Sequence, residues 1–342
     1  MEYKEIVEKL ISGEVLNEQE ATWIMSQTME GSLTPSQIAG WLTALRSRKD
    51  PESAEEVAAF AKVMRQNAVS LQEAAKRANV QLPDNLTDTC GTGGDKSNLM
   101  NISTLSAIVL ASQGIPVAKH GNKSVSSACG SADILESLGY PLMETPEQTA
   151  QRIVDKKFGF MFAPQYHPAM KYAGPVRREL GIRTVFNILG PLSNPAAAKF
   201  HVLGVFSKDL MSLMAEALKK LGVVRAFVVH SEEGLDEISP VKKTYYLEIK
   251  KGEIKEGVFD PNPLQLEIRD LNEIRASNKE EALEKAKATL SGEFLPGIEA
   301  VALNTLAALY LHDESTKDLQ SYIEENFSDL VEQMKKGISY EF

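Results

Sequence analysis

The chain is poor in cysteine and histidine, the residues that build most zinc sites and disulfide frameworks. It has two cysteines and five histidines in 342 residues. Cys90 and Cys129 form neither a disulfide framework nor a metal-binding spacing, and no two histidines are spaced as zinc ligands. We therefore expect both cysteines to be small packing residues.

Long apolar runs and an excess of positive charge are also missing. No apolar run approaches the roughly 20 residues that cross a bilayer, and the first residues, MEYKEIVEKL, contain no apolar signal segment. The formal net charge of −10 argues against general nucleic-acid binding, because Lys and Arg must neutralise phosphates there. We expect a cytoplasmic protein without a membrane or nucleic-acid partner. A polyanionic ligand would need local positive charge or a metal ion.

Two patterns of apolar residues divide the chain. Residues 1–70 show only helical spacing, with N-cap signals at Thr34 and Ser53. From about residue 82, short apolar runs alternate with helical segments, which indicates a buried, largely parallel sheet flanked by helices. Residues 244–258 predict a hairpin at an antiparallel edge. The predicted fold class is α/β, with a small helical N-terminal domain and a larger α/β domain around a mostly parallel central sheet.

A glycine-rich loop follows the first predicted strand. The sequence LTDTC at 86–90 predicts the strand, GTGGD at 91–95 the loop, and the following residues a helix with Ser103 or Thr104 as its N-cap. Glycine leaves room for backbone N–H groups to approach phosphate oxygens. A helix N-terminus adds free donors and the positive end of the helix dipole. The combination predicts a phosphate-binding site.

Two familiar phosphate-binding motifs are excluded. The last glycine of a dinucleotide-binding fingerprint would fall on Lys96, and a Walker loop needs a glycine where Asp95 stands. The alternative interpretation is a tight turn without a ligand. Three glycines, an aspartate and a following helix favour phosphate binding over that alternative.

A second polar stretch, KHGNKSVSSACGSAD at 119–133, follows the predicted strand IPVA. It lies at the C-terminal end of a strand, where ligands bind in open parallel sheets. Alone it could be a solvated loop, but beside the glycine loop we interpret it as the other wall of one site. Its donors for anionic oxygens are Lys119, Asn122, Lys123, Ser126, Ser127 and Ser131.

An acidic pair, Asp236 and Glu237, follows the predicted strand RAFVVHS. Most acidic pairs are solvated surface, but the position after a sheet strand favours a functional role. Mg²⁺ typically takes one or two carboxylates and leaves its other positions to water and substrate phosphates. A magnesium ion here would supply the positive charge that the acidic chain lacks.

Together with HPAM, PVRREL and FNILGPLSNP within residues 158–195, these segments resemble the anthranilate phosphoribosyltransferase family of tryptophan biosynthesis. The resemblance covers about residues 1–310. It implies a nucleoside-phosphorylase-like fold, a homodimer formed through the helical domain, and transfer of a phosphoribosyl group from phosphoribosyl pyrophosphate (PRPP) to the amine of anthranilate, with Mg²⁺ (two ions) as cofactor. The implied domains are a helical domain of residues 1–70, joined by helices from about 165–192, and a PRPP- and metal-binding α/β domain of residues 75–164 and 195–342.

The resemblance also implies roles for individual residues. Asn122 and Arg177 would position anthranilate, and no residue is needed to transfer a proton. The metal ligands would be Ser103, Asp236 and Glu237. The residues that would bind PRPP are Gly91, Gly94, Asp95, Asn101, Ser103, Thr104, Lys119, His120, Gly121, Asn122, Lys123, Ser126, Ser127 and Ser131. The residues that resemble the lining of the family's anthranilate channel are His120, Pro164, His167 and Gly190.

The residue types agree with this chemistry. The rigid fork of donors on an arginine suits the carboxylate of anthranilate. The alternative for Arg177 is an ion pair with a local acid such as Glu179, and we expect Arg178 and Arg183 to form structural pairs. An aniline-type amine already has a lone pair, so His120 need not act as a base.

The chain departs from the family pattern within the glycine loop. Leu99 and Met100 stand where the family usually offers a threonine hydroxyl to PRPP, so we expect a more apolar loop surface. A phosphoribosyltransferase with a changed aromatic acceptor therefore stays open.

Two further alternatives are weaker. A pyrimidine-nucleoside phosphorylase would carry a lysine before the glycines, where residues 88–90 read DTC, and would not need the acidic pair. A non-catalytic relative that binds nucleic acid is opposed by the net charge and by that same pair.

Overall fold

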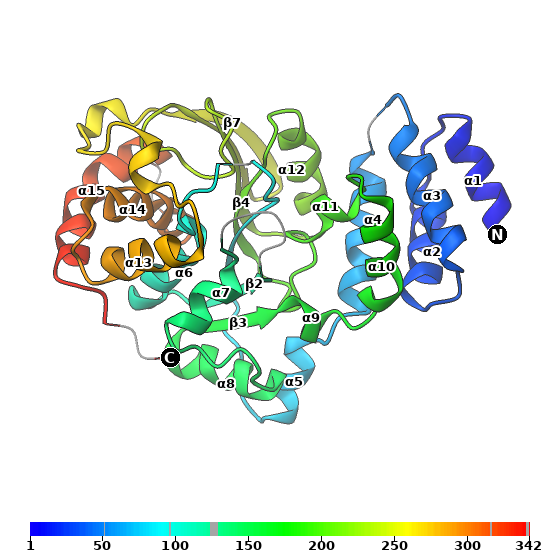
Figure 1. Cartoon of the computed structure of the whole chain (residues 1–342), viewed down its shortest axis with the longest axis horizontal. Coiled ribbons are helices and arrows are strands. Elements are labelled where there is room, and N and C mark those ends of the chain that lie inside the picture. The colour runs from blue at the N-terminus through cyan, green and yellow to red at the C-terminus, as the bar shows by residue number, and fades with distance from the viewer. Residues whose placement is uncertain (51, 96, 124–128, 315–316, 340–341) are drawn as a thin grey trace.

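The structure is a computed structural model that describes residues 1–50, 52–95, 97–123, 129–314, 317–339 and 342. Ser126 and Ser127, which were predicted to bind PRPP, lie outside the described residues. Figure 1 shows a helical bundle that contains the N-terminus beside a larger α/β part that contains the C-terminal helices.

The N-terminal helices form as their sequence predicts. They are α1 (Tyr3–Ile11), α2 (Glu18–Met29), α3 (Pro35–Ser47) and α4 (Ala54–Gln66). Thr34 caps α3 and Ser53 caps α4, each by accepting a backbone N–H from the third helical residue. Trp41 is fully buried among the apolar faces that meet inside the bundle. Two later helices join the bundle: α10 (Met170–Leu180) packs on α2 and α3, and α11 (Phe186–Leu189) packs on α4.

A seven-stranded sheet organises the rest of the chain, in the order β3-β2-β1-β4-β5-β6-β7. The first five strands in this order are parallel, and β6 and β7 form an antiparallel hairpin at one edge. The predicted fold class and the predicted edge hairpin are therefore confirmed. The strands are β1 (Thr87–Gly91), β2 (Val117–Gly121), β3 (Phe158–Phe162), β4 (Phe200–Gly204), β5 (Arg225–Ser231), β6 (Thr244–Lys250) and β7 (Glu253–Phe259).

Both faces of the sheet are covered by helices, so its strands are apolar on both sides. Val202 and Phe227 pack in a core with α6, α13, α14 and α15, whereas Leu203 and Val228 belong to the core shared with α12 and the helical bundle. The remaining helices are α5 (Leu71–Arg77), α6 (Ile102–Ser112), α7 (Ser131–Ser137), α8 (Pro146–Lys156), α9 (Ala163–Tyr166), α12 (Leu210–Lys220), α13 (Lys279–Leu290), α14 (Leu295–Tyr310), α15 (Leu319–Lys335) and the short 3₁₀ turns η1 (Asn262–Leu264) and η2 (Leu271–Ile274). Among the described helices, none has both the length and the apolar character needed to span a bilayer.

Helix α6 begins earlier than the sequence predicted. Its N-cap is Asn101, and Ser103 and Thr104 lie in the first turn, so the prediction that either of them is the cap was wrong. The Asn101 side chain makes no capping bond and instead donates to the carbonyl oxygen of Cys129 at 2.9 Å. The first turn is instead held by backbone bonds, from the Ile102 N–H to the Met100 carbonyl oxygen and from the Thr104 N–H to the Asn101 carbonyl oxygen.

Candidate active site

The largest cavity with sequence-predicted residues has a volume of about 890 Å³. It lies at the C-terminal ends of β1 and β2, which are neighbours in the sheet, and helix α10 forms its other side. The predicted site residues that line it are Gly91, Gly94, Asp95, His120, Gly121, Asn122, Pro164, His167, Arg177 and Gly190. The predicted and described site residues outside this lining are Asn101, Ser103, Thr104, Lys119, Lys123, Ser131, Asp236 and Glu237.

The glycine loop depends on its missing side chains. Gly93 and Gly94 have positive φ angles of 62° and 81°, which other residues adopt only with strain. A Cβ on Gly91 would lie 2.3 Å from Oδ2 of Asp236. The loop can therefore lie against the acidic pair only because these positions are glycine.

The acidic pair lies directly behind the glycine loop. The Gly93 N–H donates to Oδ2 of Asp236 at 2.8 Å, and the Ser103 N–H donates to Oε1 of Glu237 at 3.1 Å. Removal from water, together with the nearby Asp95 carboxylate, raises the pKa of Asp236 to about 7. Removal from water and the charge of Asp236 also raise the pKa of Glu237 well above its ordinary value.

This cluster fits a divalent cation. Three carboxylates, those of Asp95, Asp236 and Glu237, share one partly buried region, where burial first and their mutual repulsion second raise the pKa values of Asp236 and Glu237. A hard cation such as Mg²⁺ takes oxygen ligands and would remove that repulsion. The nearby Lys119 ammonium is buried and donates to the carbonyl oxygen of Thr89. Burial lowers the pKa of Lys119, so its charge is costly there without an anionic partner.

The donor-rich stretch after β2 has more than one role. His120, Gly121 and Asn122 line the cavity, whereas Lys123 forms an ion pair with Glu136 at 3.3 Å. The Ser131 hydroxyl donates to the carbonyl oxygen of Asn122 at 3.2 Å. Ser131 therefore supports the backbone of Asn122, whereas His120, Gly121 and Asn122 form the wall of the cavity.

A pair of histidines forms the apolar end of the cavity. The rings of His120 and His167 pack with their centroids 4.9 Å apart. Burial lowers the pKa of His120 to about 3, with a further contribution from His167, and burial lowers the pKa of His167 to about 4. Both rings are therefore neutral at physiological pH, and neither Nε2 has a hydrogen-bond partner among the described residues.

Arg177 faces the same cavity from α10. Its guanidinium lies over the Phe186 ring, 5.2 Å from the centroid, and burial lowers its pKa. An ion pair between Arg177 and Glu179 was the alternative. The ion pairs among the described residues do not include Arg177. An arginine without a carboxylate partner at a cavity wall is suited to an anionic ligand.

Two lining residues were not identified from the sequence. Arg183 was expected in a structural ion pair, but its guanidinium donates to the carbonyl oxygen of Gly94 at 2.9 Å and stacks on Phe206. Both residues line the cavity. The 89-residue separation between Arg183 and Gly94 explains why no local pattern marked this contact.

The apolar loop surface expected from Leu99 and Met100 is not found at the cavity. Met100 is 2% exposed and packs in the core beside Thr289 and Gly297. Leu99 forms an antiparallel bridge with Arg275. Neither residue lines the cavity, because this end of the loop turns inward to pair with a later segment.

A cluster of polar side chains adjoins this cavity through Cys90, which lines it. Asp88, Cys90 and His201 place possible ligand atoms within 4.8 Å of one another, although Cys90 was expected only to fill space. Asp88 already accepts from Asn194 at 2.7 Å and lies near the cations Lys119 and Arg65, so we interpret the cluster as an internal polar network.

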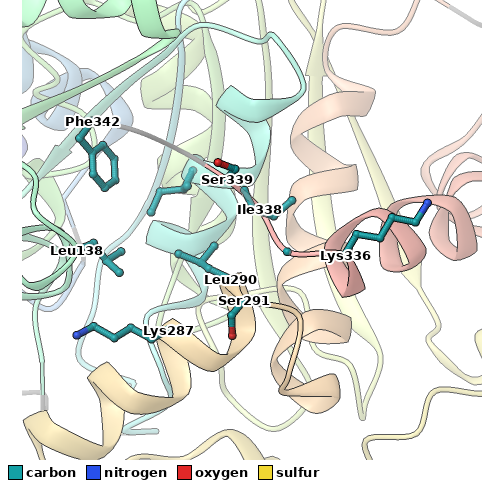
Figure 2. Close-up of a pocket in the computed structure, with 10 residues that line it drawn as sticks. Leu138, Lys287, Leu290, Ser291, Lys336, Ile338, Ser339 and Phe342 are labelled. Carbon is teal, nitrogen blue, oxygen red and sulfur yellow. The ribbon is translucent and has the colours of Figure 1, made fainter.

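A second cavity, of about 410 Å³, lies by the C-terminus, and Figure 2 shows the amines of Lys287 and Lys336 pointing to opposite sides.

Comparison with known proteins gives a consistent result over nearly the whole chain. Residues 83–340 match the glycosyl transferase family a/b domain, and residues 4–68 match the glycosyl transferase family helical bundle domain. The chain is 44% identical to an anthranilate phosphoribosyltransferase of Caldanaerobacter subterraneus over 335 residues, which are 98% of this chain and 91% of that protein.

Solved structures agree. The crystal structure of anthranilate phosphoribosyltransferase from Thermus thermophilus matches with a TM-score of 0.83 and 40% identity, over 97% of this chain and 94% of that one. The Saccharomyces cerevisiae anthranilate phosphoribosyltransferase in complex with PRPP and Mg matches with a TM-score of 0.81 and 28% identity, over 98% of this chain and 96% of that one.

Proposed function

The chain belongs to the anthranilate phosphoribosyltransferase family, and from that premise we propose how its cavity carries out the reaction. The reaction, a step of tryptophan biosynthesis, transfers the phosphoribosyl group of PRPP to the amine of anthranilate and releases pyrophosphate. The observation that carries the proposal is the arrangement of one cavity. The glycine loop and the acidic pair lie on one side of it, and an arginine without an acidic partner lies on the other.

PRPP would bind at the glycine loop and the start of α6. The glycine loop has no side chains that would keep its backbone away from an anion, and the N-terminus of α6 adds the positive end of the helix dipole. The Thr104 hydroxyl and Oδ1 of the Asn101 side chain are buried and have no partner among the described residues. The hydroxyl could donate to a phosphate oxygen, and Oδ1 could accept from a ribose hydroxyl. Further contacts would come from Lys119, His120, Gly121, Asn122, Lys123 and Ser131.

Magnesium would be held by Asp236, Glu237 and Ser103, and we propose two ions. Bound there, Mg²⁺ would neutralise charge on the departing pyrophosphate. In the structure Asp236 accepts from Gly93, and Glu237 accepts from Ser103, so the acidic pair already touches both the loop and the helix that would hold the diphosphate.

Anthranilate would bind on the opposite side of Gly91 from the pyrophosphate. Arg177 and Asn122 would orient its carboxylate and amine, and the apolar wall would be His120, Pro164, His167 and Gly190. Neutral imidazoles suit an aromatic ring better than charged ones would, and burial keeps both histidines neutral.

The chain's contribution to the rate is positioning and charge stabilisation. Cleavage of the bond from C1 of the ribose to pyrophosphate leaves positive charge on the sugar, as in glycoside cleavage. The backbone donors stabilise the leaving group, while Arg177 and Asn122 hold the amine in line with C1 on the other face. The amine attacks with its own lone pair, and the proton that its nitrogen then loses goes to water or to the released pyrophosphate, so no side chain is assigned to proton transfer.

The larger-scale assignments are also part of the proposal. Residues 1–70 together with about 165–192 would form the helical domain, and residues 75–164 and 195–342 the PRPP- and metal-binding domain. The packing of α10 and α11 on α2, α3 and α4 supports this division. We propose a cytoplasmic homodimer formed through the helical domain. A solution mass of twice 37.6 kDa would test the dimer.

A direct assay tests the function. The protein is mixed with PRPP, Mg²⁺ and anthranilate, and the loss of anthranilate fluorescence is followed together with pyrophosphate release. Loss of fluorescence that requires all three components supports the proposal. Pyrophosphate release with another aromatic amine, but not with anthranilate, would instead establish a changed acceptor.

Two variants test the assigned roles. Asp236→Asn should weaken the dependence of the rate on Mg²⁺, because it removes the charge that would hold the ion.

Arg177→Ala should raise the KM for anthranilate by about tenfold or more, the cost of losing one charged hydrogen bond, while the KM for PRPP changes little. Arg269→Ala, at an exposed arginine outside the cavity lining, is the control and should leave this KM unchanged. An unchanged KM for anthranilate in Arg177→Ala would contradict the role of that arginine.

A further inference from the structure

We propose that Arg183 is a positioning residue for the phosphate-binding loop, and that it acts by fixing the peptide between Gly94 and Asp95. This inference rests on the proposed function, because the ligand of that loop is the pyrophosphate of PRPP. Arg183 lies in the segment between α10 and α11 and lines the cavity. It therefore reaches the loop from a different part of the chain.

Arg183 is itself held in place by the loop's surroundings. Its guanidinium donates to the Gly94 carbonyl oxygen at 2.9 Å and lies 4.0 Å from the centroid of the Phe206 ring. A guanidinium stacked on an aromatic face gains cation–π attraction and loses rotational freedom. The Phe206 N–H in turn donates to the Thr92 hydroxyl at 3.1 Å. The arginine, the ring and the loop are therefore connected by three direct contacts.

The loop needs an external restraint at this point. Gly93 and Gly94 are consecutive glycines with φ angles of 62° and 81°, and glycine moves between positive and negative φ more readily than any other residue. A Cβ on Gly94 would lie 2.6 Å from Nη2 of Arg183. The arginine is thus packed against one of the two residues of the loop that have least conformational preference of their own.

Because a peptide group is planar, the contact at the Gly94 carbonyl also fixes the direction of the Asp95 N–H. In a trans peptide the carbonyl oxygen of Gly94 and the N–H of Asp95 point in opposite directions. When Arg183 holds the carbonyl, the Asp95 N–H must face the other side of the loop. The Gly93 N–H of the same loop is already bonded to Asp236 and so is not the donor in question. Arg183 therefore decides on which side of the loop the Asp95 N–H is offered to an anion.

A direct charge contact between Arg183 and pyrophosphate is the competing explanation. Arg183 is exposed and forms no ion pair with a carboxylate among the described residues, so its charge is available. The two explanations differ in what they require from the side chain. Positioning needs a donor that reaches the Gly94 carbonyl, whereas a charge contact needs a positive charge.

Three variants separate these requirements: Arg183→Met removes donor and charge, Arg183→Gln keeps a neutral donor, and Arg183→Lys keeps both. Binding of PRPP with Mg²⁺ is measured by calorimetry. We expect Arg183→Met to weaken PRPP binding by about tenfold, since one charged hydrogen bond is lost, and we expect both Gln and Lys to recover most of that loss. The KM for anthranilate should change less than twofold. Arg269→Met, at an exposed arginine outside the cavity lining, is the control and should bind PRPP like the parent protein.

Hydrogen exchange gives a second readout that needs no ligand. Amides of residues 88–95 should exchange faster in Arg183→Met than in Arg183→Gln or the parent protein, because the Gly94 peptide is no longer held. Recovery of PRPP binding by Lys alone would overturn positioning in favour of a charge contact, and equal exchange in all variants would also overturn it. If the parent protein failed to bind PRPP, the proposed function would fall, while the exchange rates would still decide whether Arg183 orders the loop.

Discussion

At the scale of single residues, Gly91 leaves no room for a side chain between the cavity and the acidic pair. A Cβ there would lie 2.3 Å from Oδ2 and 3.0 Å from Cγ of Asp236. Its backbone does not require a positive φ, so Gly91→Ala should fold normally and instead displace the Asp236 carboxylate. We expect kcat/KM for PRPP to fall by about 100-fold or more, as when a transition-state donor is lost, with little change in Tm.

A double variant checks that this loss passes through Asp236. Two substitutions that disturb one interaction do not add, so Gly91→Ala combined with Asp236→Ala should be little worse than Asp236→Ala alone. Magnesium titration of the steady-state rate measures the effect. Full additivity would show that Gly91 acts independently of the acidic pair.

Met100 is a core residue, although its position in the sequence suggested a role in the loop surface. Restoring a hydroxyl with Met100→Thr should lower the free energy of unfolding by about 2–3 kcal/mol, because it leaves a cavity and buries a polar group. The KM values for PRPP and anthranilate should stay within twofold. Urea unfolding and steady-state kinetics measure both, with Met100→Leu as the volume-conserving control. A shift in acceptor selectivity by Met100→Thr would contradict the assignment of this residue to the core.

At the scale of secondary structure, the start of α4 depends on one buried carboxylate. Glu56 is fully buried and accepts from both terminal nitrogens of Arg48, at 2.7 and 2.8 Å. It also accepts the backbone N–H groups of Leu16 and Ser53, and so joins the cap of α4 to the link between α1 and α2. Few side chains hold so many segments of the bundle together.

Replacement of this carboxylate should destabilise the bundle. Glu56→Gln should lower the free energy of unfolding by about 3–5 kcal/mol, because a buried guanidinium loses its counter-charge. The control is Glu55→Gln, whose ion pair with Lys220 is solvent-exposed and should leave the urea midpoint unchanged within error. Equal midpoints for the two variants would show that the buried pair contributes no net stability.

The helix that carries the phosphate donors shows how an element serves the site. Helix α6 has a strongly apolar sequence, and its residues 102–111 are buried with the exception of the Ser103 position. Its body is therefore fixed by packing under α14. Because the rest of the helix is immobilised, its N-terminus and the positive end of its dipole stay at one place beside the glycine loop.

At the scale of the whole molecule, buried neutral histidines make stability sensitive to acid. Burial lowers the pKa of His312 to about 4 from an ordinary value of 6.5. Below pH 6.5 the unfolded chain therefore binds a proton that the folded chain excludes, so stability decreases as the pH falls from 6.5 towards 4. His312 stacks on Phe200 and contacts Thr87, away from the cavity, so its titration does not involve ligands.

Comparing the parent protein with His312→Gln isolates the contribution of His312 to the pH dependence of stability. The free energy of unfolding of the parent protein should fall faster with acidification than that of His312→Gln, by up to about 1.4 kcal/mol per pH unit between pH 6.5 and 4. Above pH 7 the difference should be constant. Urea unfolding at a series of pH values measures it, and parallel curves across the acid range would contradict a lowered histidine pKa.

The sequence determined the elements and much of the site because those features depend on local chemistry. Capping boxes at Thr34 and Ser53 define helix starts, alternating strand and helix patterns define the parallel sheet, and glycines followed by a helix mark a phosphate-binding loop. These signals lie within a few residues of one another, so they can be identified without the fold.

Only the tertiary structure decided which of these residues meet, because such contacts join segments that no local pattern connects. It brought the Gly94 carbonyl to Arg183 and the Gly93 N–H to Asp236, across separations of 89 and 143 residues. Residues 98–100 pair with residues 274–276, and this pairing sets how the loop enters α6. As a result Met100 lies in the core and Asn101 is the N-cap of the helix. Local propensity fixes the elements, and long-range packing fixes which side of the loop faces its ligand.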